Sequence, residues 1–188
     1  MDVYLIRHPE ADLDPQLCHG RLDPPARPGF EARAERIAAQ LPRGAPVSTA
    51  ASQRCRALAD RLADRLGSTL RIDDRLRELD FGRWEGRPWH ALPRAETQDW
   101  ALDFWNHAPP DGEAYSAMHA RVAAAWDDLL EHSGADAVIV ASAGPLRALL
   151  TIALELPAES CLRIQIDHGG IARLGNSGGG WRLEFSNR

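Results

Sequence analysis

Two short polar segments follow apolar runs of this sequence, and both carry side chains that could do chemistry. Arg7 and His8 come after the apolar run at 3–6, and Ser142 comes after the run at 137–141. Open α/β sheets place their ligands at the carboxyl ends of the strands, so these side chains are expected to share one pocket. A histidine can act as a nucleophile or move a proton, and arginine recognises phosphate or carboxylate through paired hydrogen bonds. Spacing alone is weak evidence, because an Arg-His pair more often has a structural role.

The charged residues limit the classes of ligand. All 22 positively charged side chains are arginines, and 27 acidic residues give a formal net charge of −5. Without lysine there is no Walker A phosphate loop, no Schiff-base enzyme and no lysine general base. A net negative chain is also a poor candidate for nucleic-acid binding, which needs an excess of positive charge. The composition therefore allows a small anionic ligand, disfavours a polyanion, and predicts no nucleic-acid partner.

Length, cysteines and hydropathy describe an ordinary soluble domain. The chain has 188 residues, of which 44% are hydrophobic and 26% charged. Its three cysteines, Cys18, Cys55 and Cys161, are odd in number and lack a C-x-x-C pair, which favours reduced thiols over a disulfide framework or a zinc ribbon. No stretch approaches the ~20 apolar residues that span a bilayer, and the first residues do not resemble a signal peptide. We expect a cytoplasmic protein with no membrane partner.

Apolar periodicity predicts the elements that must position the polar residues. Strands are expected at 3–6, 46–50, 70–73, 137–141, 162–166, 171–174 and 181–185. Helices are expected at 30–41, 58–66 and 122–130, and from a first turn that contains Pro145. Strands that alternate with helices predict an α/β three-layer sandwich, with a mostly parallel central sheet and helices on both faces. We expect one domain over 1–188, with a Trp-rich insertion of short helices and loops at about 83–113.

Five motifs follow one another in a fixed order from residue 3 to about residue 150. They are Val3–Ala11, with Arg7 and His8 at its centre, Gly20–Pro25, Arg54 within Ser52–Ala57, Leu76–Gly86 with Glu78 at its acid position, and Pro110–Glu113. Together they resemble the histidine phosphatase superfamily, which includes the phosphoglycerate mutases. The Trp-rich stretch between the last two motifs is most similar to the alpha-ribazole phosphatases. Pro9 departs from the family, which usually has glycine after Arg-His.

The resemblance implies a phosphoglycerate mutase-like fold and hydrolysis of a small phosphomonoester through a phosphohistidine at His8. Arg7 and Arg54 would bind the phosphate, and their charge would keep His8 neutral. Glu78 would protonate the leaving oxygen and then deprotonate water. Without the motif, a surface ion pair of Glu78 with Arg77 or Arg75 would be the better interpretation. No cofactor and no metal are expected. The expected partner is a small phosphorylated metabolite, with alpha-ribazole 5'-phosphate as one candidate.

One position departs from the family in a way that bears on activity. The family has a second histidine after its strongest strand, and this chain has Ser142 there, or Ala143 if the alignment shifts by one. Serine offers the phosphoryl oxygens only a neutral donor, so we expect a rate penalty on the order of 10²–10³. A weakly active or inactive protein that binds a phosphorylated metabolite is therefore the alternative function.

Other side chains and reactions stay open. His168 could take over the role of the missing histidine or be an exposed loop residue, and His19 could line the pocket. A serine hydrolase with Ser142 as nucleophile is disfavoured, because Val140 stands where its strand-to-helix turn needs glycine. A mutase is less favoured than a hydrolase, since the sequence shows only dispersed arginines and no second cationic cluster.

Overall fold

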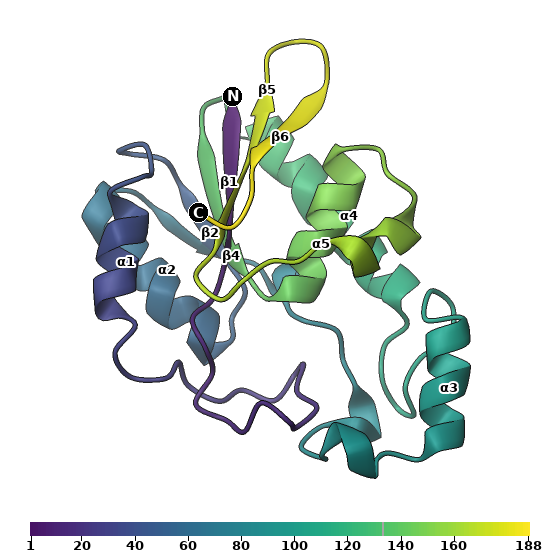
Figure 1. Cartoon of the computed structure of the whole chain (residues 1–188). Helices are drawn as coiled ribbons and strands as arrows, with labels where there is room; N and C mark the ends of the chain where they lie inside the picture. The colour runs from purple at the N-terminus through teal and green to yellow at the C-terminus, as the bar shows by residue number, and fades with distance from the viewer. Residues whose placement is uncertain (133) are drawn as a thin grey trace.

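A computed structural model describes residues 1–132 and 134–188, and its centre is a six-stranded sheet (Figure 1). The strands are β1 (Asp2–Arg7), β2 (Val47–Thr49), β3 (Leu70–Ile72), β4 (Ala137–Ala141), β5 (Ile171–Asn176) and β6 (Trp181–Phe185), in the spatial order β3-β2-β4-β1-β5-β6. The first four in that order are parallel neighbours, whereas β5 runs antiparallel to β1 and β6. The sheet is therefore mostly parallel, as predicted.

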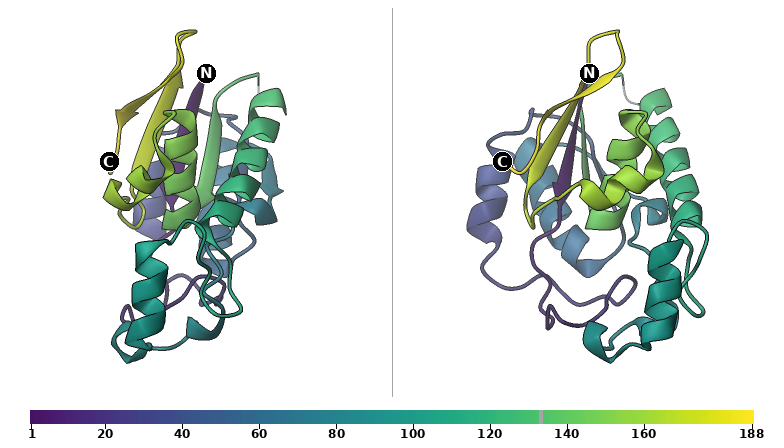
Figure 2. Two further views of the ribbon diagram at one scale, coloured as in Figure 1. Left: turned by 90° about the vertical axis from the view of Figure 1, so that its right-hand side faces the viewer. Right: turned by 45° about the vertical axis from the view of Figure 1, so that its right-hand side comes forward.

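Helices cover both faces of this sheet. These helices are α1 (Glu31–Ala38), α2 (Gln53–Leu66), α4 (Tyr115–His132) and α5 (Ala143–Ala153), whereas α3 (Arg94–Leu102) lies apart from the sheet. In Figure 1 the sheet is seen nearly edge-on, with α1 and α2 on its left and α4 and α5 on its right. The turned views of Figure 2 show the same separation. The predicted three-layer α/β architecture is confirmed.

The sequence explains why the strands that carry the site lie in the middle. Every residue of β4 is buried, and so are the four central residues of β1. Parallel strands covered on both faces are expected to be continuous apolar runs, and these two are. Among the described residues, no helix is long and apolar enough to cross a membrane.

Two long segments lie at the carboxyl ends of the parallel strands. The segment after β1 and the Trp-rich region around α3 occupy the lower part of Figures 1 and 2. Trp84 is buried there with Cys18 and Leu92 in a small second core, and its indole N–H donates to Glu96 at 3.0 Å. This second core holds the two segments together, because Cys18 comes from the first and Trp84 from the other.

The predicted strand at 162–166 is wrong. Residues Ala158–Arg163 form a 3₁₀ helix, and no strand pairing follows it before β5. The carbonyl oxygens that a ladder would use accept hydrogen bonds from arginine side chains instead: Arg147 donates to Ile164 at 2.7 Å and Arg7 to Ile166 at 2.6 Å. Because arginine side chains satisfy these backbone acceptors, the apolar run does not need to pair with a neighbouring strand.

Candidate active site

His8 and Ser142 lie side by side at the carboxyl edge of the sheet. Arg7 pairs with Ala141 in the register of β1 and β4, so the next residue of each strand leaves the sheet at the same level. The His8 backbone N–H donates to the Ala141 carbonyl at 3.1 Å. Both side chains are buried, with exposed fractions of 2% for His8 and 3% for Ser142. The structure therefore brings the two predicted strand ends into one place, where α/β sheets bind ligands.

The hydrogen bonds of His8 fix its tautomer. Its Nδ1 lies against the carbonyl oxygen of Pro9, which can only accept, so Nδ1 carries the hydrogen. The Nε of Arg54 donates to Nε2 of His8 at 3.2 Å, so Nε2 carries the lone pair. Burial, followed by the charge of Arg54, holds the pKa of His8 well below its usual value of 6.5. His8 is thus a neutral imidazole with a nucleophilic nitrogen next to a guanidinium.

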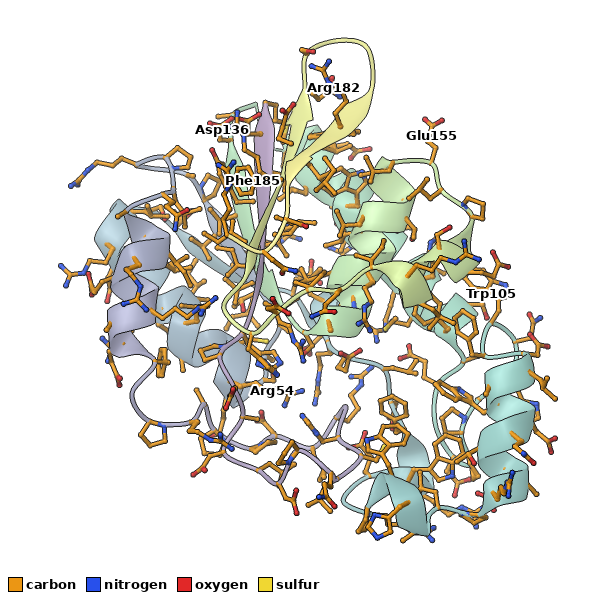
Figure 3. The ribbon with its side chains drawn as sticks, viewed as in Figure 1. Arg54, Trp105, Asp136, Glu155, Arg182 and Phe185 are labelled. Carbon is orange, nitrogen blue, oxygen red and sulfur yellow. The ribbon has the colours of Figure 1, made fainter. Side chains whose placement is uncertain are left out.

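Arg54 is fixed by the loop that crosses the site. It lies in the first turn of α2, is 1% exposed and is labelled in Figure 3 below the ends of the strands. Its Nη1 donates to the Leu22 carbonyl at 2.7 Å and its Nη2 to the Gly20 carbonyl at 2.8 Å. The guanidinium therefore ties helix α2, the loop at 20–22 and His8 into one unit.

Glu85 fixes the same loop from its other side. Its carboxylate accepts backbone N–H groups from the loop and from Phe81, at 2.8 to 3.1 Å; the loop donors are Gly20, Arg21 and Leu22. A side chain on Gly20 would meet the Leu79 carbonyl at 1.9 Å, so the approach requires glycine. Glu85 was not predicted as a site residue, although it stands in the motif Leu76–Gly86 that pointed to Glu78.

Arg7 has one nitrogen without a partner. Its Nη1 donates to the Ile166 carbonyl at 2.6 Å and its Nη2 to Nε2 of His168 at 3.0 Å. Its Nε is buried and has no hydrogen-bond partner within the described part of the chain. Burial lowers the pKa of Arg7, but a guanidinium keeps its charge. An unsatisfied buried donor on a cation is a position where an anionic oxygen fits.

His168 is held by Arg7 and by the backbone of His8. Because Arg7 can only donate, Nε2 of His168 accepts, and Nδ1 donates to the His8 carbonyl at 3.2 Å. The two imidazole ring centres are 5.3 Å apart. Burial and the nearby Arg7 lower the pKa of His168. His168 is therefore a partly buried neutral residue that positions Arg7; with both ring nitrogens engaged, it is neither a free proton donor nor a base for Ser142.

Glu78 lies at the N-terminal end of α5. Its Oε1 accepts the backbone N–H of Leu79 at 2.8 Å and its Oε2 that of Gly144 at 3.0 Å. A Cβ atom on Gly144 would lie 2.0 Å from Oε1, so this approach depends on glycine. Among the described residues Glu78 forms no ion pair with Arg77 or Arg75, and Arg75 binds Asp73 and Asp128 instead.

Arg121 fixes the backbone that carries Glu78. From α4 it donates to the Arg75 and Arg77 carbonyls at 2.6 and 2.7 Å and to the Glu78 carbonyl at 3.1 Å. Glu113 binds its guanidinium at 2.8 Å. The motif Pro110–Glu113 thus contributes a counter-ion to the support of Glu78. The sequence did not predict this role, because Arg121 stands in none of the five motifs.

Ser142 brings no cation to the cluster. It precedes α5 in an extended conformation (φ −84°, ψ 172°), and its hydroxyl makes no capping hydrogen bond. Burial raises the pKa of the neighbouring Cys55 thiol to about 11, while the hydroxyls of Ser52 and Ser142 act in the opposite direction. The site therefore has a neutral hydroxyl group at the end of β4.

His19 is half-buried and shares a cavity with one other candidate. Its Nδ1 contacts the Leu17 carbonyl at 3.1 Å, and it lines a cavity of about 340 Å³ together with His168 and Glu10. Among the described residues it makes no hydrogen bond to His8, Arg54 or Arg7. Over residues 1–132 and 134–188 there is no group of three side chains suited to hold a metal ion.

The comparison with known proteins assigns the family. The model of the histidine phosphatase superfamily (branch 1) matches residues 3–188, and the chain belongs to this superfamily. It is 30% identical over 183 residues to a Yersinia pestis relative named "Probable phosphoglycerate mutase GpmB", covering 93% of this chain and 84% of the relative. The family resemblance inferred from the five motifs is confirmed.

Two solved structures have the same fold. The alpha-ribazole phosphatase of Shigella flexneri superposes with a TM-score of 0.89 at 23% identity, over 100% of this chain and 96% of the other. A mycobacterial glucosyl-3-phosphoglycerate phosphatase in complex with VO3 gives a TM-score of 0.86 at 24% identity, over 99% and 98%. These likenesses confirm the predicted fold.

Proposed function

We propose that this protein hydrolyses a small phosphomonoester through a phosphohistidine at Nε2 of His8. The observation that carries the proposal is the state of His8: buried, neutral, and with its lone pair directed at a guanidinium. A neutral imidazole is nucleophilic, and the cations that keep it neutral are those that a phosphoryl group needs. The unpartnered Nε of Arg7 supports a second contact to the same group.

In the first half-reaction, Nε2 of His8 attacks phosphorus and the bond to the leaving oxygen breaks. The Nε of Arg54 exchanges its contact with His8 for a phosphoryl oxygen, and Arg7 binds another. Glu78 gives its proton to the leaving alkoxide. Glu78 regains this proton from the attacking water in the second half-reaction.

In the second half-reaction, water attacks the phosphohistidine. Glu78 takes a proton from this water, the P–N bond breaks, and His8 regains its lone pair as phosphate leaves. Ser142 donates one neutral hydrogen bond where a charged donor would stabilise the transition state more strongly. We therefore expect turnover below that of an otherwise equal site with a histidine, by on the order of 10²–10³.

The substrate is assigned only to the class of small phosphomonoesters. The named relatives and fold neighbours act, by their names, on alpha-ribazole phosphate, a glucosyl phosphoglycerate or phosphoglycerate. Alpha-ribazole 5'-phosphate is one member of the panel to test. The alternative, a protein that binds a phosphorylated metabolite with little turnover, is motivated by Ser142.

A phosphatase assay over a metabolite panel separates the two functions. We compare the wild type with His8→Ala and, as a matched control, with His107→Ala, whose side chain is exposed. Phosphate release that disappears only in His8→Ala, together with an acid-labile phosphoryl group on His8 by mass spectrometry, supports hydrolysis. Equal rates in wild type and His8→Ala refute it. Phosphate-ester binding by calorimetry without turnover would favour the binding protein instead.

A further inference from the structure

Glu85 and Arg54 bind the same loop, at 20–22, through different groups of its backbone. The N–H groups of all three loop residues donate to the Glu85 carboxylate, at 2.8 to 3.1 Å. The carbonyl groups of Gly20 and Leu22 accept hydrogen bonds from Nη2 and Nη1 of Arg54, at 2.8 and 2.7 Å. A short run of backbone therefore connects a carboxylate with the guanidinium that contacts the nucleophile.

One peptide group makes both kinds of contact. In the bond between Gly20 and Arg21, the N–H donates to Glu85 at 2.8 Å and the carbonyl oxygen accepts from Arg54 at 2.8 Å. This peptide bond is trans, so its N–H and its C=O point in opposite directions within one rigid plane. A rotation of the plane that breaks the bond to Glu85 also moves the acceptor away from Arg54. The position of the guanidinium is therefore coupled to that of the carboxylate.

Glu85 is well placed to hold this peptide, because the chain on both sides of it is fixed. The preceding residue, Trp84, is 1% exposed and belongs to the small second core. The N–H of the following residue, Gly86, donates to the Cys18 carbonyl at 2.8 Å. Within the described part of the chain, the Glu85 carboxylate accepts only backbone N–H groups, those of the loop and of Phe81. Its negative charge is therefore directed at the loop.

Arg54 carries the effect from the loop to the nucleophile. Its two terminal nitrogens hold the loop, and its Nε lies 3.2 Å from Nε2 of His8. Because the guanidinium is planar and rigid, the direction of its Nε–H bond depends on where the two loop carbonyls lie. The start of α2 is fixed separately, since Asp23 accepts the backbone N–H of Gln53 at 2.7 Å. A shift of the loop carbonyls would therefore turn the guanidinium relative to His8.

Resting on the role of Arg54 in the function proposed above, we propose that Glu85 is a positioning residue of the reaction. Through the Gly20–Arg21 peptide it sets the direction in which Arg54 points its Nε at His8 and at an incoming phosphoryl oxygen. The simpler alternative is a loop anchor that affects only the stability of the fold. The two roles are separable, because only the first changes the binding of an oxyanion and the protonation of His8.

The first test measures the binding of inorganic phosphate by calorimetry, which needs no turnover. Glu85→Gln keeps the shape of the side chain but replaces one acceptor oxygen by a donor, which opposes the loop N–H groups. We expect the dissociation constant of phosphate to rise about tenfold, the cost of one weakened hydrogen bond to a charged group. Glu131→Gln, the same change at an exposed residue near the end of α4, is the matched control and should leave binding unchanged.

The second test is the direction in which the pKa of His8 moves, followed by proton NMR. Burial is the first cause of its low pKa and the charge of Arg54 the second; His168 and Arg7 also face it. Removing the charge of Glu85 would by itself lower the pKa of His8, because the imidazolium loses an attraction. Turning Arg54 away removes a close repulsion and raises the pKa. We expect a rise in Glu85→Gln; a fall or no change refutes the positioning role.

A double-mutant cycle assigns the effect to Arg54. In an Arg54→Lys protein, which lacks the planar guanidinium, Glu85→Gln should change the dissociation constant of phosphate little, because both substitutions act on one contact. A tenfold effect in both backgrounds overturns the proposal. If thermal unfolding shows that Glu85→Gln does not fold, Glu85→Asp takes its place with the same expectations, since its shorter side chain keeps the charge but not the reach to the loop.

These measurements keep the inference separate from the proposed catalysis. Phosphate binding and a His8 titration that depend on Glu85 support the positioning role even if the wild type hydrolyses no ester. Hydrolysis that is lost in His8→Ala but unchanged in Glu85→Gln would leave the phosphatase and remove the positioning role.

Discussion

Substituting Gly144 by alanine should disable Glu78 without unfolding the protein. The added Cβ would lie 2.0 Å from Oε1 and 3.0 Å from Cδ of Glu78, whereas an ordinary contact needs about 3.4 Å or more. The carboxyl group must therefore move by more than ~1 Å. Gly144 is in the first turn of α5, where alanine is a better helix former than glycine by about 1 kcal/mol. The added methyl group therefore displaces the Glu78 carboxyl group and does not destabilise helix α5.

A displacement of this size sets the expected loss of activity. Moving a catalytic group by 1 Å costs about 10²-fold, and losing a general acid costs about 10²–10⁴. We expect kcat/KM for an alkyl phosphate to fall by about 10² in Gly144→Ala. The loss should be smaller for p-nitrophenyl phosphate, whose leaving group needs little protonation. Gly134→Ala is the matched control, because no atom lies within 4 Å of its added Cβ.

A double substitution shows whether the loss acts through Glu78. In a Glu78→Gln protein the acid is already absent, so adding Gly144→Ala should change the rate little, since the two sites are in contact and not independent. If Gly144→Ala lowers the rate by the same factor in both backgrounds, or equally for both leaving groups, the assignment of Glu78 as the acid is refuted. Thermal unfolding of each variant confirms that the folded state is being compared.

Three further outcomes follow from the contacts in the site. Ser142→His should raise turnover by on the order of 10²–10³, and an unchanged steady-state rate would mean that the missing histidine does not limit the reaction. His168→Ala should weaken inhibition by inorganic phosphate about tenfold, because Arg7 loses the acceptor at 3.0 Å; an unchanged inhibition constant would remove the positioning role. Burial keeps the pKa values of His8 and His168 below 6.5, so below that pH the unfolded chain binds more protons than the folded one. The free energy of unfolding should therefore fall on acidification below pH ~6.5, by up to about 1.4 kcal/mol per pH unit for each histidine, and stay level above it; urea denaturation at pH 5.5 and 7.5 that gives equal values would contradict this.

The fold was predictable where burial dictates sequence. Strands β1 and β4 are buried on both faces, so their apolar runs identify them without reference to partners. The predicted strand at 162–166 was wrong because carbonyl groups of this segment accept hydrogen bonds from Arg7 and Arg147. These arginines are distant in the chain, so no local sequence pattern could indicate them.

The site was predictable at its motif positions but not in its contacts. The family motifs indicated His8 and Glu78, yet the tautomer of His168 follows from a guanidinium on one side and a carbonyl on the other. Side-chain partners fixed by tertiary structure carry no periodic signal.

The structural hydrogen bonds of Arg54 affect whether evolution would retain this residue in a related protein. Its two terminal nitrogens bind the carbonyls of Gly20 and Leu22, and these bonds hold the loop whether or not any chemistry occurs. Selection for a folded protein would therefore preserve Arg54 after catalysis was lost. Its presence in a descendant therefore says little about turnover.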